Sequence, residues 1–295
     1  MTGLRAGDYA PPWSSPPQGG VRYTVPCVDN APDLHGTPYR PDLVILFGGN
    51  QFMVLPPLME AFRQAYPVYP RIYYETLPPG IVERQLRTGS LVMGNLCIDV
   101  PADVFVAGSE RVKRLHDDGL VEAPRAYLSN RLAIMVYRDN PKGIRGLADL
   151  DRDDVRVAMP NLETEGIAEK AVDALKKAGG QALSGAVMEA KVADGTTFIT
   201  QIHHRETPLR VLHGESDAGV VWITEALFQQ RLGHPVDYVE IPEAHNAVGK
   251  TAVAIVRGAV HAQAVADFAT FLVGSEAAEI YAEYGFEPVD GHSAQ

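Results

Sequence analysis

The sequence predicts an α/β protein of two lobes, each a mostly parallel sheet flanked by helices, with a cleft between the lobes. The chain has 295 residues, of which 46% are hydrophobic and 21% are charged, so it is long enough for two ordinary domains. From Leu43 onwards short apolar strands alternate with amphipathic helices, which is typical of a parallel, doubly wound sheet. The same alternation restarts after Pro141. Two similar halves are therefore expected.

The first set of elements follows a Pro- and Gly-rich start without clear periodicity, so residues 1–40 are predicted to form a partly irregular arm. Each expected strand is a short apolar run, and each expected helix repeats apolar residues every three or four positions. We expect strands at 43–47, 71–75, 103–108 and 132–138, and helices at 56–66, 80–89 and 109–119.

The second set continues the same alternation to the end of the chain. We expect strands at 155–160, 186–191, 218–223, 236–243 and 251–258, and helices at 166–179, 198–206, 224–233 and 264–285. This order assigns residues 41–127 and 248–290 to lobe 1 and residues 128–247 to lobe 2. Hinge crossings are predicted near 127–130 and 238–246.

Charge and composition exclude several classes of function. The formal net charge of -11 and the absence of clustered Lys and Arg argue against a nucleic-acid partner. An anionic small ligand remains compatible, because local dipoles rather than total charge define a site. No apolar run approaches the ~20 residues of a membrane span, so we expect a soluble chain. The polar start fits a mature protein whose signal peptide was removed, while a cytoplasmic location stays open.

Catalytic motifs are missing from the sequence. It contains no Gly-x-Ser-x-Gly elbow, no P-loop, no CxxC pair and no His-Glu-x-x-His. A binding protein without a cofactor is therefore expected rather than an enzyme. A ligand-sensing domain and a metal-dependent enzyme remain alternatives.

Polar residues follow the predicted strands at the positions where ligands bind in open α/β sheets, beyond the carboxyl ends and at helix N-termini. Each of these residues also fits a purely structural role as a helix cap or a dipole partner. The candidate ligand contacts are Asn50, Gln51, Glu75, Thr76, Glu163, Thr164, Glu165, Gly166, Trp222 and Thr224.

Two further groups of residues have alternative interpretations. His203 and Glu206 have a helical spacing that suits a shared metal, although a polar helix face or a hydrogen-bond cluster beside the hinge is the favoured explanation. Cys27 and Cys97 would form one disulfide that ties the arm to lobe 1, or remain two free thiols.

Several segments resemble the molybdate-binding type of periplasmic solute-binding protein from ABC importers. They are VPADVFVAGSERVKRLHDDGLV, NRLAIMVYRDNP, GIAEKAVDALKKAG, HGESDAGVVWITEAL and AEYGFEPV, and the resemblance covers about residues 42–289. It implies a type II periplasmic-binding-protein fold that closes on a molybdate- or tungstate-like oxyanion. It also implies a periplasmic, monomeric protein that delivers its ligand to a membrane permease.

The sequence departs from that family at the expected site. Asn50 stands where the family has a small hydroxyl residue, and Glu75 and Thr76 replace Gly and Ser. An ionised Glu75 facing the ligand would repel a dianion. A bound metal ion, a metal complex or a small organic acid therefore remains an alternative ligand.

Overall fold

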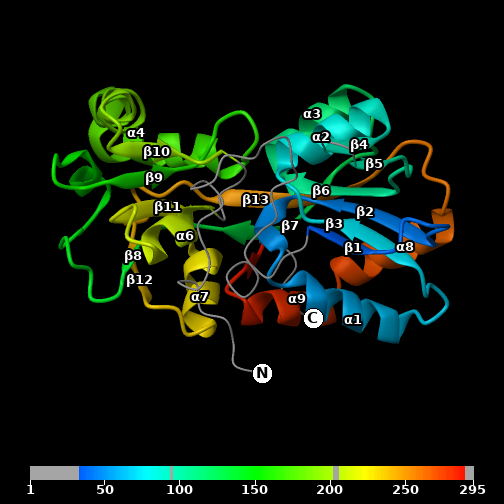
Figure 1. The fold of residues 1–295 in the computed structure, drawn as a ribbon. Coiled ribbons are helices and arrows are strands. Elements are labelled where there is room, and N and C mark those ends of the chain that lie inside the picture. Colours follow the sequence, from blue (N-terminus) through cyan, green and yellow to red (C-terminus); the bar gives the residue numbers. More distant parts are fainter. Residues whose placement is uncertain (1–32, 94–95, 202–205, 290–295) are drawn as a thin grey trace. The chain divides into compact units, whose positions relative to one another are not determined.

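A computed structural model describes residues 33–93, 96–201 and 206–289 (Figure 1). The chain divides into two compact units. The central unit is one continuous stretch, Asn130–Gly249, and the split unit consists of the described residues of 33–129 and 250–289. The residues of the second predicted hinge crossing, 238–246, lie inside the central unit.

The split unit is built on a seven-stranded sheet in the order β1-β3-β2-β6-β13-β7-β14. Its strands are β1 (Leu34–Gly36), β2 (Leu43–Phe47), β3 (Ile72–Glu75), β6 (Val104–Gly108), β7 (Arg125–Asn130), β13 (Gly249–Ile255) and β14 (Glu287–Pro288). β3, β2 and β6 run parallel, whereas β1, β13 and β14 join their neighbours antiparallel. Because the parallel strands are adjacent, their carboxyl ends meet at one edge of the sheet.

Helices cover both faces of this sheet (Figure 1). They are α1 (Leu55–Ala65), α2 (Pro79–Thr88), α3 (Ser109–Asp117), α8 (Ala262–Leu272) and α9 (Ser275–Glu283). On the side of α2 and α3, Val44 and Leu46 belong to one apolar cluster with Val82. On the other side, the rings of Phe47 and Phe62 each pack edge-on against Phe268. Strand alternation thus supplies an apolar residue to each face in turn.

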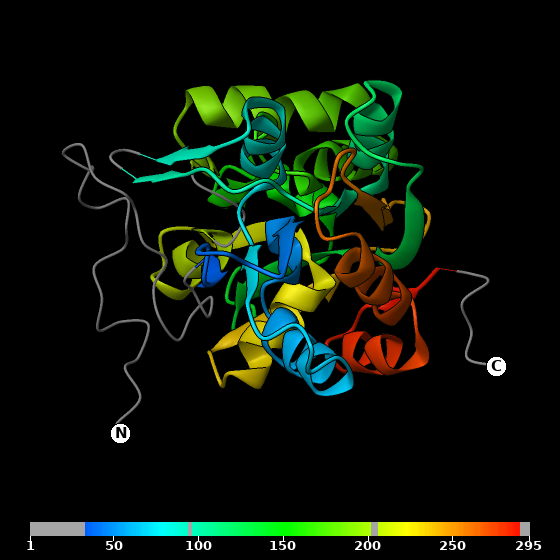
Figure 2. The ribbon, with the colours of Figure 1, turned by 90° about the vertical axis from the view of Figure 1, so that its right-hand side faces the viewer.

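A small hairpin of β4 (Leu91–Met93) and β5 (Leu96–Ile98) projects from the split unit (Figure 2). Cys97 is exposed on β5. Cys27 lies outside the described residues, so the disulfide stays a prediction.

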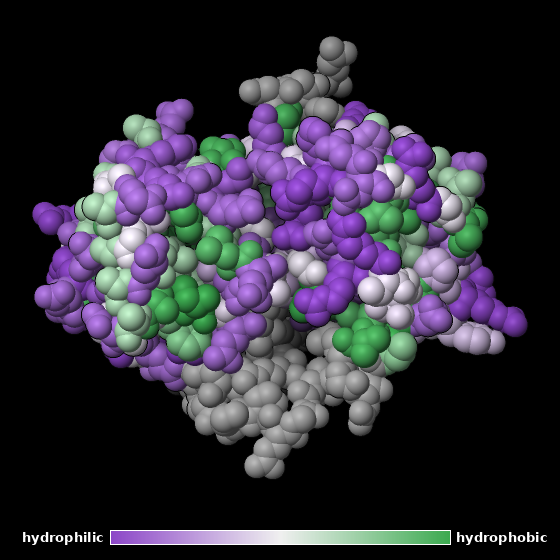
Figure 3. Space-filling view, turned by 90° about the horizontal axis from the view of Figure 1, so that it is seen from above, coloured by the Kyte–Doolittle hydropathy of each residue, from purple (hydrophilic) through white to green (hydrophobic). Residues whose placement is uncertain are grey.

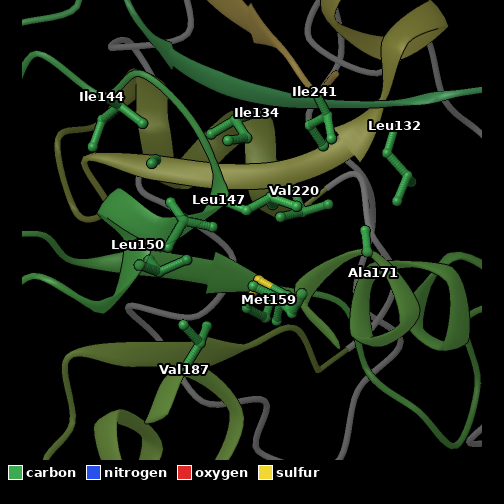
Figure 4. Close-up of a cluster of buried hydrophobic side chains, with 14 of the residues drawn as sticks. Leu132, Ile134, Ile144, Leu147, Leu150, Met159, Ala171, Val187, Val220 and Ile241 are labelled. Carbon is green, nitrogen blue, oxygen red and sulfur yellow. The ribbon is translucent and has the colours of Figure 1, made fainter. Parts of the chain in front are cut away.

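The central unit has a five-stranded sheet in the order β10-β9-β11-β8-β12. Its strands are β8 (Leu132–Tyr137), β9 (Val157–Met159), β10 (Thr197–Ile199), β11 (Ala218–Trp222) and β12 (Val236–Glu240). Its helices are η3 (Leu147–Asp151), α4 (Ile167–Gly185), η4 (Ala186–Ala190), α5 (Lys191–Ala193), α6 (Glu206–Leu212) and α7 (Ile223–Arg231). Apolar side chains from these strands and from η3, α4 and η4 form its core, as Figure 4 shows for Leu147, Met159 and Val187.

The predicted α/β class is confirmed, but the two large sheets are mixed rather than mostly parallel. In the central unit β10, β9 and β11 are parallel, and β8 and β12 join antiparallel. The first strand, β1, forms within the predicted arm, where it pairs with β3.

Three predicted elements were wrong. The expected strand 186–191 is helical, because Leu183, Val187 and Lys191 are buried at a spacing of four residues. The expected helix 198–206 begins as strand β10, which pairs in parallel with β9. The expected long helix 264–285 is two helices, because Gly274 adopts an extended conformation before α9.

The helices at the top of Figure 1 present mainly hydrophilic residues when seen from above (Figure 3). Among the helices of the described residues, none combines the length and apolarity needed to cross a bilayer.

Candidate functional site

The predicted ligand residues fall into two groups, one in each unit. In the split unit they lie where β2 and β3 end side by side. After β2 the backbone is extended at Gly48, whose N–H donates to the carbonyl of Val106 on β6 at 2.7 Å. A Cβ on Gly49 would lie only 2.8 Å from the carbonyl oxygen of Thr76. The absence of a side chain at Gly49 therefore allows the loops after β2 and β3 to lie in contact.

Asn50 and Gln51 form a single 3₁₀ turn, η2 (Gly49–Gln51), but their side chains differ. Asn50 is half-buried and makes no hydrogen bond with any described residue. Gln51 is fully buried, and its Oε1 accepts hydrogen bonds from two tyrosine hydroxyls. Asn50 therefore has a carboxamide to offer to a ligand, whereas Gln51 is engaged with the protein.

Glu75 is fully buried at the end of β3 and is surrounded by neutral donors. Its Oε1 accepts from the Tyr73 hydroxyl at 2.8 Å and from the Gln85 Nε2 at 2.9 Å. Burial raises the pKa of Glu75, and the two hydrogen bonds only partly oppose that rise. The neutral form is thus favoured. Because its partners lie on β3 and α2, Glu75 acts as an internal polar anchor of the split unit.

Thr76 is also engaged within the split unit. It is fully buried, and its hydroxyl donates to the Asp33 carboxylate at 2.9 Å. Its backbone N–H donates to the Asp33 carbonyl at 2.9 Å. These contacts attach the chain before β1 to the end of β3, which is a structural role.

Sequence reasoning did not single out Ser109, the first residue of α3. β6 runs parallel beside β2, so the start of α3 lies at the same sheet edge as η2. The Ser109 Oγ is buried without a hydrogen-bond partner among the described residues. It borders a cavity of about 340 Å³ that Lys113 and His116 also line. The signal in the sequence was a serine directly after a strand, which we expected to be no more than part of a helix.

In the central unit, the loop after β9 folds around a buried carboxylate. Glu165 is buried, and its Oε1 accepts from the Thr200 hydroxyl and from the Asn161 N–H. Asn161 in turn accepts from the Glu163 N–H at 2.7 Å through its Oδ1. Glu165 therefore joins the ends of β9 and β10.

The remaining residues of that loop present their groups differently. Glu163 and Gly166 are exposed. The Thr164 Oγ1 is buried without a hydrogen-bond partner among the described residues. Thr164 thus retains an unused donor near the start of α4.

Trp222 and Thr224 lie at the end of β11, next to β9 in the parallel part of the sheet. Trp222 is buried in the apolar core, and a Cβ on Gly249 would lie 2.3 Å from its ring. Thr224 is fully buried, and its Oγ1 accepts from the Asn130 Nδ2 at 2.9 Å. Both side chains contact the protein interior of the central unit, so their packing explains them without a ligand.

The predicted metal pair is only partly described. His203 lies outside the described residues. Glu206 is buried on α6, where its Oε1 pairs with Arg210 at 3.0 Å and its Oε2 accepts from the Gln201 N–H at 2.7 Å. Within the described ranges, no three His, Cys, Asp or Glu side chains gather in a metal-binding group. A metal at His203 and Glu206 stays a prediction that would compete with the Arg210 ion pair.

The segment PADVF of the family resemblance also has a structural explanation. The carboxylate of Asp103 is fully buried and accepts from the N–H of Val44 at 2.8 Å. It accepts from the N–H groups of Val260 and His261 as well. Asp103 therefore ties β2 to the start of α8.

The known proteins that resemble this chain in sequence or in fold include molybdate-binding and sulfate-binding proteins. Molybdate-binding protein ModA of Mycobacterium bovis is 26% identical over 189 residues, 63% of this chain, and the match spans 65% of the length of that relative. The sulfate-binding protein SubI of Mycobacterium tuberculosis H37Rv has a similar fold, with a TM-score of 0.68, 20% identity and coverage of 84% of this chain and 87% of that one.

The periplasmic molybdate-binding protein of Azotobacter vinelandii gives a TM-score of 0.66 at 16% identity, covering 83% of this chain and 98% of that one. These likenesses establish the type II periplasmic-binding-protein fold. Residues 43–287 match the family described as bacterial extracellular solute-binding protein. The chain therefore belongs to this family of bacterial extracellular solute-binding proteins, and is a binding protein rather than an enzyme.

Proposed function

We propose that this protein binds a molybdate- or tungstate-like oxyanion and delivers it, as an extracytoplasmic monomer, to the membrane permease of an ABC importer. The family membership and the ModA relatives support a small solute carried by an importer. The observation that carries the choice of an oxyanion is the environment of Glu75. Its carboxyl group is turned onto Tyr73 and Gln85, and burial favours its neutral form.

The burial of Glu75 weakens the main objection to an anionic ligand, because it raises the pKa of this carboxyl group. The carboxyl group is also turned onto Tyr73 and Gln85, and the nearby Asn50 carboxamide has no hydrogen-bond partner among the described residues. The start of α3 lies at the same sheet edge, and helix N-termini favour negative charge through their free N–H groups and dipole. Donors without a fixed negative charge suit an oxyanion.

In the central unit we propose the loop 163–166 as the complementary set of contacts. Thr164 has an unused hydroxyl, and α4 begins at Ile167. Closure would proceed around the two points where the chain passes from one unit to the other, at Ser129–Asn130 and Gly249–Lys250. Ligand would then select the closed state.

The test is a thermal-shift and calorimetry screen of metal-stripped protein against molybdate, tungstate, sulfate, phosphate, divalent and trivalent cations, and small carboxylates. A ligand that binds only the native state at 100 times its Kd stabilises it by about 2.7 kcal/mol. We expect saturable stabilisation by molybdate or tungstate, and weaker binding in Asn50→Ala. Stabilisation only by cations or only by carboxylates would overturn the proposal in favour of a metal, a metal complex or an organic acid.

A further inference from the structure

Gln51 lies at the centre of a buried cluster that joins three distant segments of the split unit. Its Oε1 accepts from the hydroxyl of Tyr127 on β7 at 2.9 Å and from the hydroxyl of Tyr281 on α9 at 2.6 Å. The two hydroxyls are 3.3 Å apart, and the rings pack edge to face with centroids 5.7 Å apart. All three side chains are at most 3% exposed. We name these residues the Gln51 cluster.

Both hydroxyls of the cluster are fixed in their neutral, donating form. Burial raises the pKa of Tyr127 and of Tyr281 well above the usual value for tyrosine. Two neutral donors therefore converge on one carbonyl oxygen. This arrangement fixes the orientation of the Gln51 amide, because exchanging its oxygen and nitrogen would place donors against donors unless the hydroxyls also turned.

The cluster also has a cost that stability alone does not explain. The Gln51 Nε2 is buried and has no hydrogen-bond partner among the described residues. A buried donor without a partner is unfavourable, and an apolar side chain of similar size would avoid that penalty. If the Gln51 amide is needed to hold the turn in place, that need would account for a glutamine here in spite of the penalty.

The first two backbone hydrogen bonds of the turn that contains Gln51 are long. The Gln51 N–H reaches the Gly48 carbonyl at 3.4 Å, and the Phe52 N–H reaches the Gly49 carbonyl at 3.4 Å. Both distances are longer than usual for a backbone hydrogen bond. The Gln51 carbonyl accepts from the Val54 N–H at the ordinary distance of 3.0 Å. The side-chain bonds to the tyrosines, at 2.9 and 2.6 Å, are shorter than all three, so the cluster is a strong further anchor of this turn.

We propose that Gln51 is a positioning residue rather than a ligand contact, and that the Gln51 cluster fixes η2 so that Asn50 faces the ligand in one orientation. This inference rests on the proposed function for the role of Asn50. It assigns the two carboxamides of the turn to different tasks, with Asn50 binding and Gln51 holding the turn in place.

The test compares Gln51→Leu with a matched control, Gln229→Leu. Gln229 is also a fully buried amide, but it lies on α7 of the central unit and bonds His234 at 2.6 Å rather than the turn. We expect Gln51→Leu to weaken molybdate binding at least tenfold by calorimetry. It should also raise amide hydrogen exchange at Phe52 and Val54 at least tenfold. Gln229→Leu should lower the melting temperature while leaving both readouts within twofold of wild type.

Two further variants separate positioning from direct contact. Tyr281→Phe removes the shorter of the two bonds and should move both readouts in the same direction as Gln51→Leu, by a smaller factor. It also serves as the test if Gln51→Leu fails to fold. In an Asn50→Ala background, Gln51→Leu should cost little further affinity, because Gln51 acts through Asn50. Additive losses in the double variant would overturn positioning in favour of a direct contact.

The exchange readout does not depend on the ligand. If wild type binds no oxyanion, the proposed function fails, and unchanged exchange in Gln51→Leu would separately overturn the anchoring of the turn. If wild type binds molybdate and Gln51→Leu binds it equally well, the positioning role is wrong while the proposed function stands.

Discussion

Glu75 in the split unit and Glu206 in the central unit are both buried glutamates, yet their surroundings are opposite. Glu75 is fully buried, and its Oε1 accepts hydrogen bonds from the neutral donors of Tyr73 and Gln85. Glu206 is 4% exposed and pairs with the guanidinium of Arg210, which also bonds Glu215 and lies over the ring of Phe198. One carboxyl group is buried among neutral donors, and the other is buried against a guanidinium.

The difference shows how burial acts on a charge in two ways. Without an opposite charge, burial raises the pKa of the carboxyl group, as at Glu75. Where a guanidinium lies beside the carboxyl group, as at Glu206, removing that group would leave a buried cation behind. The pKa of Arg210 shows the same conflict, because burial lowers it while Glu206 opposes that change. The three predictions that follow test this contrast.

The largest effect is expected for Glu206→Ala. Removing one partner of a buried ion pair costs about 3–5 kcal/mol, because the other charge stays buried without full compensation. Urea unfolding monitored by circular dichroism measures the loss. Glu215→Ala is the matched control, since Glu215 contacts the same guanidinium but is 34% exposed. Equal small losses in both variants would show that Arg210 is not held by Glu206.

Glu75→Gln is expected to have an intermediate effect that depends on pH. The folded-state pKa of Glu75 is raised above its ordinary value of 4.5, so the folded protein binds more protons than the unfolded chain between 4.5 and that higher value. Stability should therefore fall as pH rises through this window. Glutamine cannot titrate, so Glu75→Gln should gain stability relative to wild type as the pH rises from 4 to 7.

The pH series uses denaturant unfolding at each pH. Glu60→Gln, at an exposed glutamate of α1, controls for the loss of one negative charge. A stability difference between Glu75→Gln and wild type that stays constant from pH 4 to pH 7 would mean that Glu75 ionises normally in the folded protein.

The smallest effect is expected for Tyr73→Phe. This change removes one hydrogen bond to Glu75 and should cost about 1 kcal/mol. Because that bond favours the charged form of Glu75, its loss should also extend the pH-dependent fall in stability to higher pH. Tyr74→Phe is the control, since Tyr74 points to the other face of β3 and stacks on His35. A pH profile shared by both variants would contradict the contact.

Most of the fold was predictable because it follows local patterns. Strands such as 43–47 are continuous apolar runs, and helices such as α1 and α3 show a regular apolar spacing. Residues 186–191 misled because a short window looks like alternation. The helical spacing emerges only when Leu183 is included with Val187 and Lys191, and Lys191 is buried because its Nζ donates to the carbonyls of Arg152 and Val155.

The candidate site was less predictable, because sequence cannot reveal which partner a polar side chain finds. Glu75, Thr76 and Glu165 follow strands as ligand residues do, but they bond to Gln85, Asp33 and Thr200. Those partners lie on other segments, and pairing across segments depends on packing. Asn50 was predicted from its place after β2 alone, and its role as a contact remains a prediction.

The discontinuous path of the split unit also matters during synthesis. β13 lies between β6 and β7 in the seven-stranded sheet, although it follows them by more than a hundred residues in the chain. A ribosome therefore completes the whole central unit before it releases the strand that fills this gap. Because domains tend to fold as units while the chain emerges, the split unit must wait with β6 and β7 unjoined. A chain that ended near Gly249 would lack the strand between β6 and β7, so the sheet of the split unit would be incomplete.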